Sequence, residues 1–200
     1  MSQRIVIVNT GCANISSVKF ALERLGVQVE VSAEDNVIKA ADKVFLPGVG
    51  TATAAMTSIH GKRLAPTLHN LTQPVLGVCL GMQLMVESSD ETRTGTVECL
   101  NLMSGKVKRL MAGELRLPHM GWNTVSPSPD SPLFTGIPEG TYFYFVHSFA
   151  VPVYEHTVAS CEYGQPFSAA IGHNNFFGVQ FHPERSGEAG AELLNNFVNL

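Results

Sequence analysis

Short apolar runs alternate with segments of helical periodicity through the first half of the chain. The apolar runs are rich in β-branched residues, as buried parallel strands are, and they cover residues 4–10, 27–31, 43–50 and 73–79. Between the first two runs, an apolar stripe at helical spacing ends at Gly26, where a helix C-cap belongs. Helical sequence returns around residues 51–71. This alternation predicts an α/β fold in which a mixed, mostly parallel central sheet is flanked by helices on both faces.

The second half of the chain has a different pattern. Short strand-like segments separated by turn residues occupy most of residues 105–181, with little helical periodicity. We expect them to be antiparallel or mixed strands that extend the same core. The chain closes with a predicted helix that Ser186 can cap, and its apolar stripe includes Leu193 and Leu194. No repeat or low-complexity tract is present, so residues 1–200 are expected to form one domain.

Composition and charge narrow the class of protein. The chain has 44% hydrophobic and 15% charged residues and a formal net charge of −4, so it lacks the basic face that nucleic acid or an anionic membrane would require. No apolar stretch reaches the roughly 18–20 residues of a membrane span, and no signal-peptide pattern is present. The four cysteines lie far apart without a C-x-x-C pair, which predicts reduced thiols in a cytoplasmic protein.

One cysteine stands in a pattern that favours catalysis. Cys79 lies between Gly77 and Gly81, after an apolar strand-like run and before a helix expected to start at about Gly81. This G-x-C-x-G pattern is the thiol counterpart of the nucleophile elbow, a strained turn that exposes its nucleophile at the carboxyl end of a sheet. The helix dipole would favour a thiolate, and the backbone N–H of Leu80 would stabilise an oxyanion. The alternative is a buried structural cysteine beside chance glycines.

A base for such a nucleophile is available near the C-terminus. His182 follows a strand-like run, and Glu184 stands two residues later. In an extended segment these two side chains project to the same side, so Glu184 can hold the imidazole and fix its tautomer. Taken alone, His-Pro-Glu also fits an ordinary surface turn. The other histidines have no metal-like spacing, and no metal site is predicted.

A glycine-broken turn supplies a second candidate oxyanion donor. The sequence LPGVG ends a predicted strand. Gly48 lets the peptide bond that follows it adopt orientations that other residues cannot reach. The functional interpretation is that the N–H of Val49 faces the site. A plain glycine turn is the competing interpretation.

The chain resembles the class I glutamine amidotransferases over almost its full length, in three segments with the order and spacing of that family: FLPGVG, GVCLGMQL and GVQFHPERSG. Within the family, NTGCANISSV, PHMGWN and YFYFVHSF resemble the glutaminase subunits of imidazole glycerol phosphate synthases. The resemblance implies a flavodoxin-like fold and a Cys–His–Glu triad that hydrolyses L-glutamine. It also implies that the partner is a TIM-barrel cyclase subunit, to which ammonia passes for imidazole-ring closure in histidine biosynthesis. No cofactor is implied.

The same resemblance implies further site residues. Those expected to bind glutamine are Gly50, Gln83, Glu91, Ser148 and Phe149, the last two through backbone. Those expected at the cyclase contact are Asn14, Trp122, Tyr144 and Arg185. For the tryptophan and the tyrosine, a plain core position is the alternative.

Two other functions stay open at this stage. An independent cysteine hydrolase acting on γ-glutamyl compounds would use the same triad without a partner, and its isolated chain would turn over readily. A catalytically silent binding or regulatory subunit would need a damaged triad, whereas Cys79, His182 and Glu184 are all present.

Overall fold

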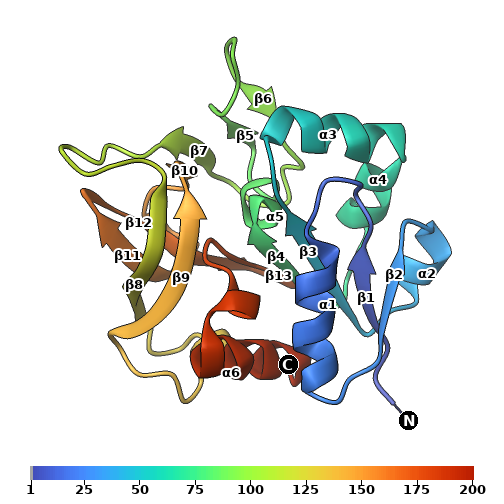
Figure 1. Ribbon diagram of the computed structural model, residues 1–200. Coiled ribbons are helices and arrows are strands. Elements are labelled where there is room, and N and C mark those ends of the chain that lie inside the picture. The colour runs from blue at the N-terminus through green and yellow to red at the C-terminus, as the bar shows by residue number, and fades with distance from the viewer. Residues whose placement is uncertain (1) are drawn as a thin grey trace.

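The computed structural model describes residues 2–200 and is built around one nine-stranded mixed sheet (Figure 1). In spatial order its strands are β2 (Val29–Ser32), β1 (Ile5–Val8), β3 (Lys43–Gly48), β4 (Val75–Cys79), β13 (Phe176–Val179), β12 (Gln165–His173), β11 (Thr157–Tyr163), β8 (His119–Pro127) and β9 (Thr141–His147). The strands from β2 to β13 run parallel, and those from β13 to β9 pair antiparallel. The predicted α/β fold with antiparallel strands extending a parallel core is therefore confirmed.

A smaller sheet and six α-helices complete the described chain. The four-stranded sheet has the order β10 (Phe149–Ala150), β7 (Lys106–Arg109), β5 (Ser88–Ser89) and β6 (Val97–Glu98). The helices are α1 (Ile15–Arg24), α2 (Asp35–Lys39), α3 (Ala52–Gly61), α4 (Leu64–His69), α5 (Leu80–Gln83) and α6 (Gly187–Val198), with 3₁₀ turns η1 (Pro132–Phe134) and η2 (Pro183–Arg185). None of the helices in residues 2–200 is long and apolar enough to cross a membrane.

The parallel strands are buried on both faces, which explains their uninterrupted apolar sequence. Alternate residues of β1 enter different clusters, because successive side chains of a strand point to opposite faces. Ile5 and Ile7 pack with α1 and α6, whereas Val6 and Val8 pack with α2, α3 and α4. In Figure 1, α1 lies in front of the parallel strands, and α6 lies next to its lower end. Helices thus cover both faces, as the sequence predicts.

Three local expectations differ from the structure. The helical stretch over 51–71 is two helices, because Arg63 adopts a left-handed conformation with φ of 56° between α3 and α4. The helix after the cysteine begins at Leu80 and has four residues. Ser186 occupies the N-cap position of α6 without a capping bond. Its hydroxyl instead donates to the His182 carbonyl and accepts from the Tyr144 N–H, so it fastens η2 to β9.

The sheet brings three distant segments to one edge. Gly48 at the end of β3 pairs with Cys79 at the end of β4, and β13 runs parallel to β4 on its other side. The segment after β13 continues from the same edge to His182. Because ligands bind outside the carboxyl ends of parallel strands, this edge is where a site is expected.

Candidate active site

Cys79 occupies a strained turn between β4 and α5. Its φ of 55° and ψ of −114° lie in a region that residues with a side chain rarely adopt. The flanking glycines make the turn possible. A Cβ on Gly81 would lie 1.8 Å from the Leu46 carbonyl oxygen, and one on Gly77 would lie 2.7 Å from the Gly81 carbonyl. Strand and helix backbones therefore pass as closely as the glycine pattern predicts.

The short α5 changes the electrostatic argument. A helix of four residues has too little length for a strong dipole. What remains is local: Leu80 is the first residue of α5, so its N–H has no acceptor within the helix. That N–H directly follows the sulfur and is available to an oxyanion. The turn geometry, rather than a long helix, therefore supplies this donor.

His182 and Glu184 form a buried pair next to Cys79. The His182 Nδ1 and Glu184 Oε1 atoms are 2.7 Å apart, and only 8% and 2% of the two side chains are exposed. Burial by itself would lower the pKa of His182, but hydrogen bonds to Cys79 and Glu184 outweigh it and raise that pKa to about 10. The imidazole is therefore held between a carboxylate and the sulfur, with its Nδ1 committed to the carboxylate.

The backbone that makes this pair differs from the expected extended segment. His182 is extended, with φ of −100° and ψ of 96°, but residues 183–185 form the 3₁₀ turn η2. The turn folds Glu184 back onto the imidazole of His182. The predicted contact is present, and a turn rather than strand alternation produces it.

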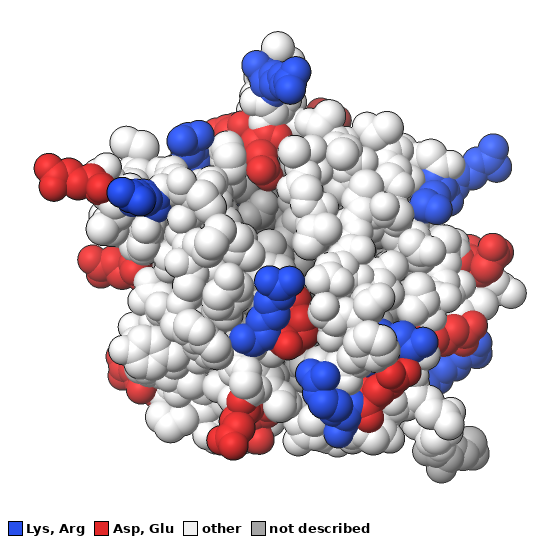
Figure 2. Space-filling view, viewed as in Figure 1, with Lys and Arg blue, Asp and Glu red and all other residues white. Residues whose placement is uncertain are grey.

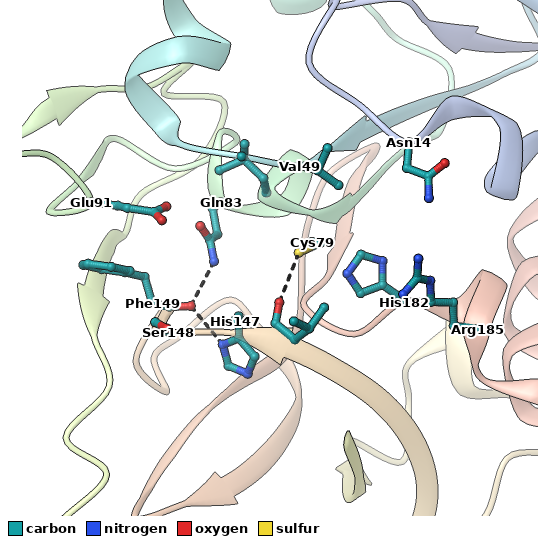
Figure 3. Close-up of a pocket in the computed structure, with 13 residues that line it drawn as sticks. Asn14, Val49, Cys79, Gln83, Glu91, His147, Ser148, Phe149, His182 and Arg185 are labelled. Atoms are coloured by element: carbon teal, nitrogen blue, oxygen red, sulfur yellow. Dashed lines mark hydrogen bonds between the residues drawn. The ribbon is translucent and has the colours of Figure 1, made fainter. Parts of the chain in front are cut away.

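One cavity of about 280 Å³ contains most of the candidate residues (Figure 3). Cys79, Leu80 and His182 line it together with all the candidate glutamine-binding residues: Gly50, Gln83, Glu91, Ser148 and Phe149. Val49, Asn14 and Arg185 also line it, whereas Trp122 and Tyr144 do not. Figure 3 places Cys79 and His182 side by side, with Gln83 and Glu91 on the other side of the cavity.

Glu91 is a carboxylate without a cation. Burial raises its pKa above the ordinary value, and it forms no ion pair with a basic side chain within residues 2–200. A cationic group entering the cavity would relieve that desolvation. This environment suits the α-ammonium group of an amino acid.

Val49 does not present its N–H to the cavity. That N–H donates to the carbonyl oxygen of Cys12 over 3.1 Å. Of the two predicted donors, only the N–H of Leu80 has no acceptor within residues 2–200, so the predicted hole is incomplete in this conformation. The 48–49 peptide would have to rotate to complete it.

Three polar residues at the site escaped the sequence analysis. Gln180 is fully buried, and its Nε2 lies 3.8 Å from the sulfur of Cys79. His119 and His147 are buried on β8 and β9 with ring nitrogens 2.9 Å apart. A signal was available, since each is a polar residue inside an apolar strand run, and buried polar groups need partners. Within residues 2–200, no group of three or more His, Cys, Asp or Glu side chains is placed to hold a metal ion.

The geometry of the His182–Glu184 pair predicts that mutations of the two residues lower the rate of glutamine hydrolysis by different factors. If the role of Glu184 is to orient the imidazole, Glu184→Gln should retain part of the hydrogen bond to Nδ1 and keep measurable glutamine hydrolysis. His182→Ala should lower the rate of glutamine hydrolysis about 10² to 10⁴-fold more than Glu184→Gln does, because it removes the group that carries the proton. Steady-state release of glutamate by the two variants measures the difference. Equal rates for the two variants would contradict a purely orienting Glu184.

Comparison with known proteins adds a family to this geometry. A family model described as glutamine amidotransferase class-I matches residues 6–200. The chain is similar to the imidazole glycerol phosphate synthase subunit HisH of Vibrio cholerae, with 56% identity over 203 residues, which cover 100% of both chains. It is also similar to subunit HisH of Pasteurella multocida, with 57% identity over 196 residues and 98% of each chain covered.

Solved structures give the same fold at low sequence identity. PurLQS from Thermotoga maritima aligns with a TM-score of 0.74 and 18% identity, covering 100% of this chain and 99% of the other. A glutamine amidotransferase from Thermotoga maritima aligns with a TM-score of 0.63 and 14% identity, covering 100% and 84%. At such identity these likenesses concern the fold alone.

Proposed function

The chain belongs to the class-I glutamine amidotransferase family, and we propose that it hydrolyses L-glutamine with Cys79, His182 and Glu184 as the glutaminase subunit of an imidazole glycerol phosphate synthase. The observation that carries the residue assignment is the His182–Glu184 pair, 2.7 Å apart and buried against the strained Cys79 turn. The relatives over 50% identical along the whole chain support the synthase and histidine biosynthesis.

Hydrolysis proceeds in two halves. The thiolate of Cys79, paired with a protonated His182, attacks the side-chain carboxamide carbon of glutamine, and the carbonyl electrons move onto oxygen. The N–H of Leu80 stabilises that oxyanion. When the C–N bond breaks, His182 passes its proton to the leaving nitrogen, and ammonia departs from a γ-glutamyl thioester. His182 then deprotonates a water that attacks the thioester, and glutamate leaves as the sulfur departs as a thiolate beside the reprotonated His182. Glu184 holds the imidazole throughout.

A surface beside the cavity suits a protein partner. On β8 and β9, Trp122 pairs with Tyr144, their ring centroids lie 6.1 Å apart, and Trp122 is 54% exposed. Met120 and Tyr142 on the same strands are 63% and 59% exposed. Aromatic and methionine side chains are typical of the centre of protein interfaces. A plain core position, the alternative for Trp122, does not fit a side chain that is half exposed.

This surface is where we place the cyclase subunit. Arg185 and Asn14 line the cavity opposite Gln83 and Glu91 (Figure 3). Figure 2 shows that the middle of this face, around a hollow, is mostly uncharged apart from a small mixed-charge group, while Lys, Arg, Asp and Glu gather toward the edges. A TIM-barrel cyclase docked here would receive ammonia directly and perform the lyase chemistry. The resulting heterodimer would work in the cytoplasm, in keeping with four free cysteines.

The proposal is tested by reconstituting the synthase. The chain combined with a TIM-barrel cyclase should support imidazole glycerol phosphate formation from glutamine, whereas the cyclase alone should require ammonium. Trp122→Ala should weaken the complex by about 2 kcal/mol or more, as loss of a central interface tryptophan does. Titration calorimetry measures the affinity, and product formation measures coupling.

A matched control separates docking from general exposure. Val153 is 50% exposed on the loop after β10 and does not line the cavity. Val153→Ala should leave the affinity unchanged. Equal weakening by both variants would remove the assignment of this surface, and glutamine turnover that ignores the cyclase would favour the independent hydrolase.

A further inference from the structure

A continuous line of hydrogen bonds links β8 to the glutamine cavity without involving the catalytic pair. Asn123 Nδ2 lies 3.1 Å from His119 Nε2, His119 Nδ1 lies 2.9 Å from His147 Nε2, and His147 Nδ1 lies 2.9 Å from the carbonyl oxygen of Phe149. The same carbonyl accepts from Gln83 Nε2 over 2.9 Å. Figure 3 shows His147 and Gln83 converging on this oxygen.

The direction of every hydrogen bond in the line is determined by the backbone groups along it. The Asn123 amide can be oriented in one way only, because its oxygen accepts from the Thr124 N–H and its nitrogen donates to the Glu162 carbonyl. Asn123 therefore donates to His119 Nε2. At the other end the Phe149 carbonyl can only accept, so His147 Nδ1 carries a proton. The bond between the rings must then run from His119 Nδ1–H to His147 Nε2.

Both histidines are consequently neutral and carry their proton on Nδ1. Their surroundings support this state. His119 lies stacked between Phe145 and Tyr163, with ring centroids 4.8 Å and 4.1 Å away. Burial lowers the pKa of His119 to about 4. Burial likewise lowers the pKa of His147 to about 3, against the opposing effect of the Phe149 hydrogen bond.

The last residue of this line is Gln83, and the hydrogen bonds of its amide set its orientation. Because its nitrogen donates to both the Phe149 carbonyl and Gln180 Oε1, its oxygen is left for the cavity and accepts no hydrogen bond within residues 2–200. Figure 3 shows that oxygen on the side of Glu91. Two acceptors, the Gln83 oxygen and the Glu91 carboxylate, thus face one part of the cavity, where a cation with several N–H donors fits.

We propose that His119 and His147 are positioning residues that hold the Phe149 carbonyl, and through it Gln83, so that the Gln83 oxygen faces the α-ammonium group of glutamine. This inference rests on the proposed function, because it assumes that glutamine occupies the cavity. Without the donor from residue 119, His147 is free to move its proton to Nε2. Its Nδ1 would then set a lone pair against the Phe149 carbonyl and push it away from Gln83.

The first test measures the tautomers directly. Long-range ¹H–¹⁵N spectra of the ¹⁵N-histidine-labelled chain should show His119 and His147 neutral, each with its proton on Nδ1, at neutral pH. Signals are assigned by their loss in single-histidine variants. A proton on Nε2 of either ring, or a positive charge on either, would overturn the proposal. This experiment needs no turnover, so its failure is distinct from failure of the glutaminase function, which would appear as absent glutamine hydrolysis by the unaltered complex.

The second test measures substrate discrimination in the reconstituted complex. His119→Phe keeps a ring between Phe145 and Tyr163 but removes the donor to His147. KM for glutamine should rise about tenfold, the size of one charge-assisted hydrogen bond, with kcat nearly unchanged. The preference for glutamine over glutaramate, which lacks the α-amino group, should fall by the same factor.

Rescue and a matched control separate positioning from packing. His119→Asn places an N–H donor where Nδ1 was, and it should restore most of the preference. His156→Phe alters another histidine that packs against an imidazole, with ring centroids 4.3 Å apart, and it should leave KM and preference unchanged. An unaltered preference for glutamine in His119→Phe would refute the positioning role, whatever its effect on stability.

Discussion

Cys79→Ala is expected to abolish glutamine-dependent synthesis while leaving ammonium-dependent synthesis intact. The sulfur forms the thioester, so its loss removes the covalent route altogether, a decrease of roughly 10⁶-fold in comparable enzymes. Alanine tolerates the positive φ at this turn no better than cysteine does, so the backbone change is small. The cyclase chemistry is untouched, because it uses ammonia from any source. The measurement is product formation by the complex with either nitrogen donor.

Selective labelling provides the control for this prediction. An electrophilic glutamine analogue should modify one cysteine, since Cys79 alone stands beside a base in the cavity. Burial raises the pKa of Cys99 to about 11 and that of Cys161 to about 12, so both are thiols at neutral pH. Cys99→Ala should retain glutamine-dependent synthesis. Equal labelling of Cys12, Cys99 or Cys161 would be incompatible with Cys79 as sole nucleophile.

The liganded complex is expected to hydrolyse glutamine at least about 10²-fold faster than the free chain, because the N–H of Val49, which we propose as the second oxyanion donor, is engaged elsewhere in the free chain. The N–H of Val49 is held by the Cys12 carbonyl at 3.1 Å. Releasing it costs about one net hydrogen bond, roughly 1 kcal/mol. The next residue, Gly50, has a φ of 94°, so the turn is built from glycines that tolerate unusual backbone angles. A partner that favours the rotated peptide by a few kcal/mol would restore the full donor set.

Steady-state glutamine hydrolysis tests whether the partner frees the N–H of Val49. Glutamine turnover is compared for the free chain, the complex, and the complex holding the cyclase ribonucleotide or an analogue. The rate of glutamine hydrolysis is expected to rise along this series. Side-chain mutation cannot test the switch instead, because the Cys12 acceptor is a backbone oxygen. A free chain that already turns over at the rate of the liganded complex would exclude the switch and favour an independent hydrolase.

The parts of the site that sequence predicts well are those encoded by consecutive residues. Gly77, Cys79 and Gly81 predict a close strand–helix turn, because only glycine fits where a Cβ would meet a carbonyl oxygen at 1.8 Å. His182 and Glu184 lie two residues apart, so their contact needs only a local turn. The parallel strands were equally predictable, since burial on both faces leaves an unbroken apolar run.

Other features could not be assembled from the sequence alone, because they depend on partners far apart in sequence. His119 and His147 read as single polar residues within apolar strands, and only the antiparallel register of β8 with β9 places them opposite each other. The interruption of the 51–71 helix at Arg63 had a local signal that the sequence analysis did not use, since Gly61 and Pro66 both disfavour the interior of a continuous helix.

The amino-acid sequence by itself determined the α/β class, the strained cysteine turn and the identity of the catalytic candidates, because these follow from periodicity, glycine placement and neighbouring residues. Tertiary structure alone decided which groups are free to act. The N–H of Val49 is occupied by the carbonyl of Cys12, which belongs to a distant loop of the chain. The proton positions on His119 and His147 are dictated by Asn123 and Phe149. Hydrogen-bond direction is a property of assembled donors and acceptors, so no linear pattern encodes it.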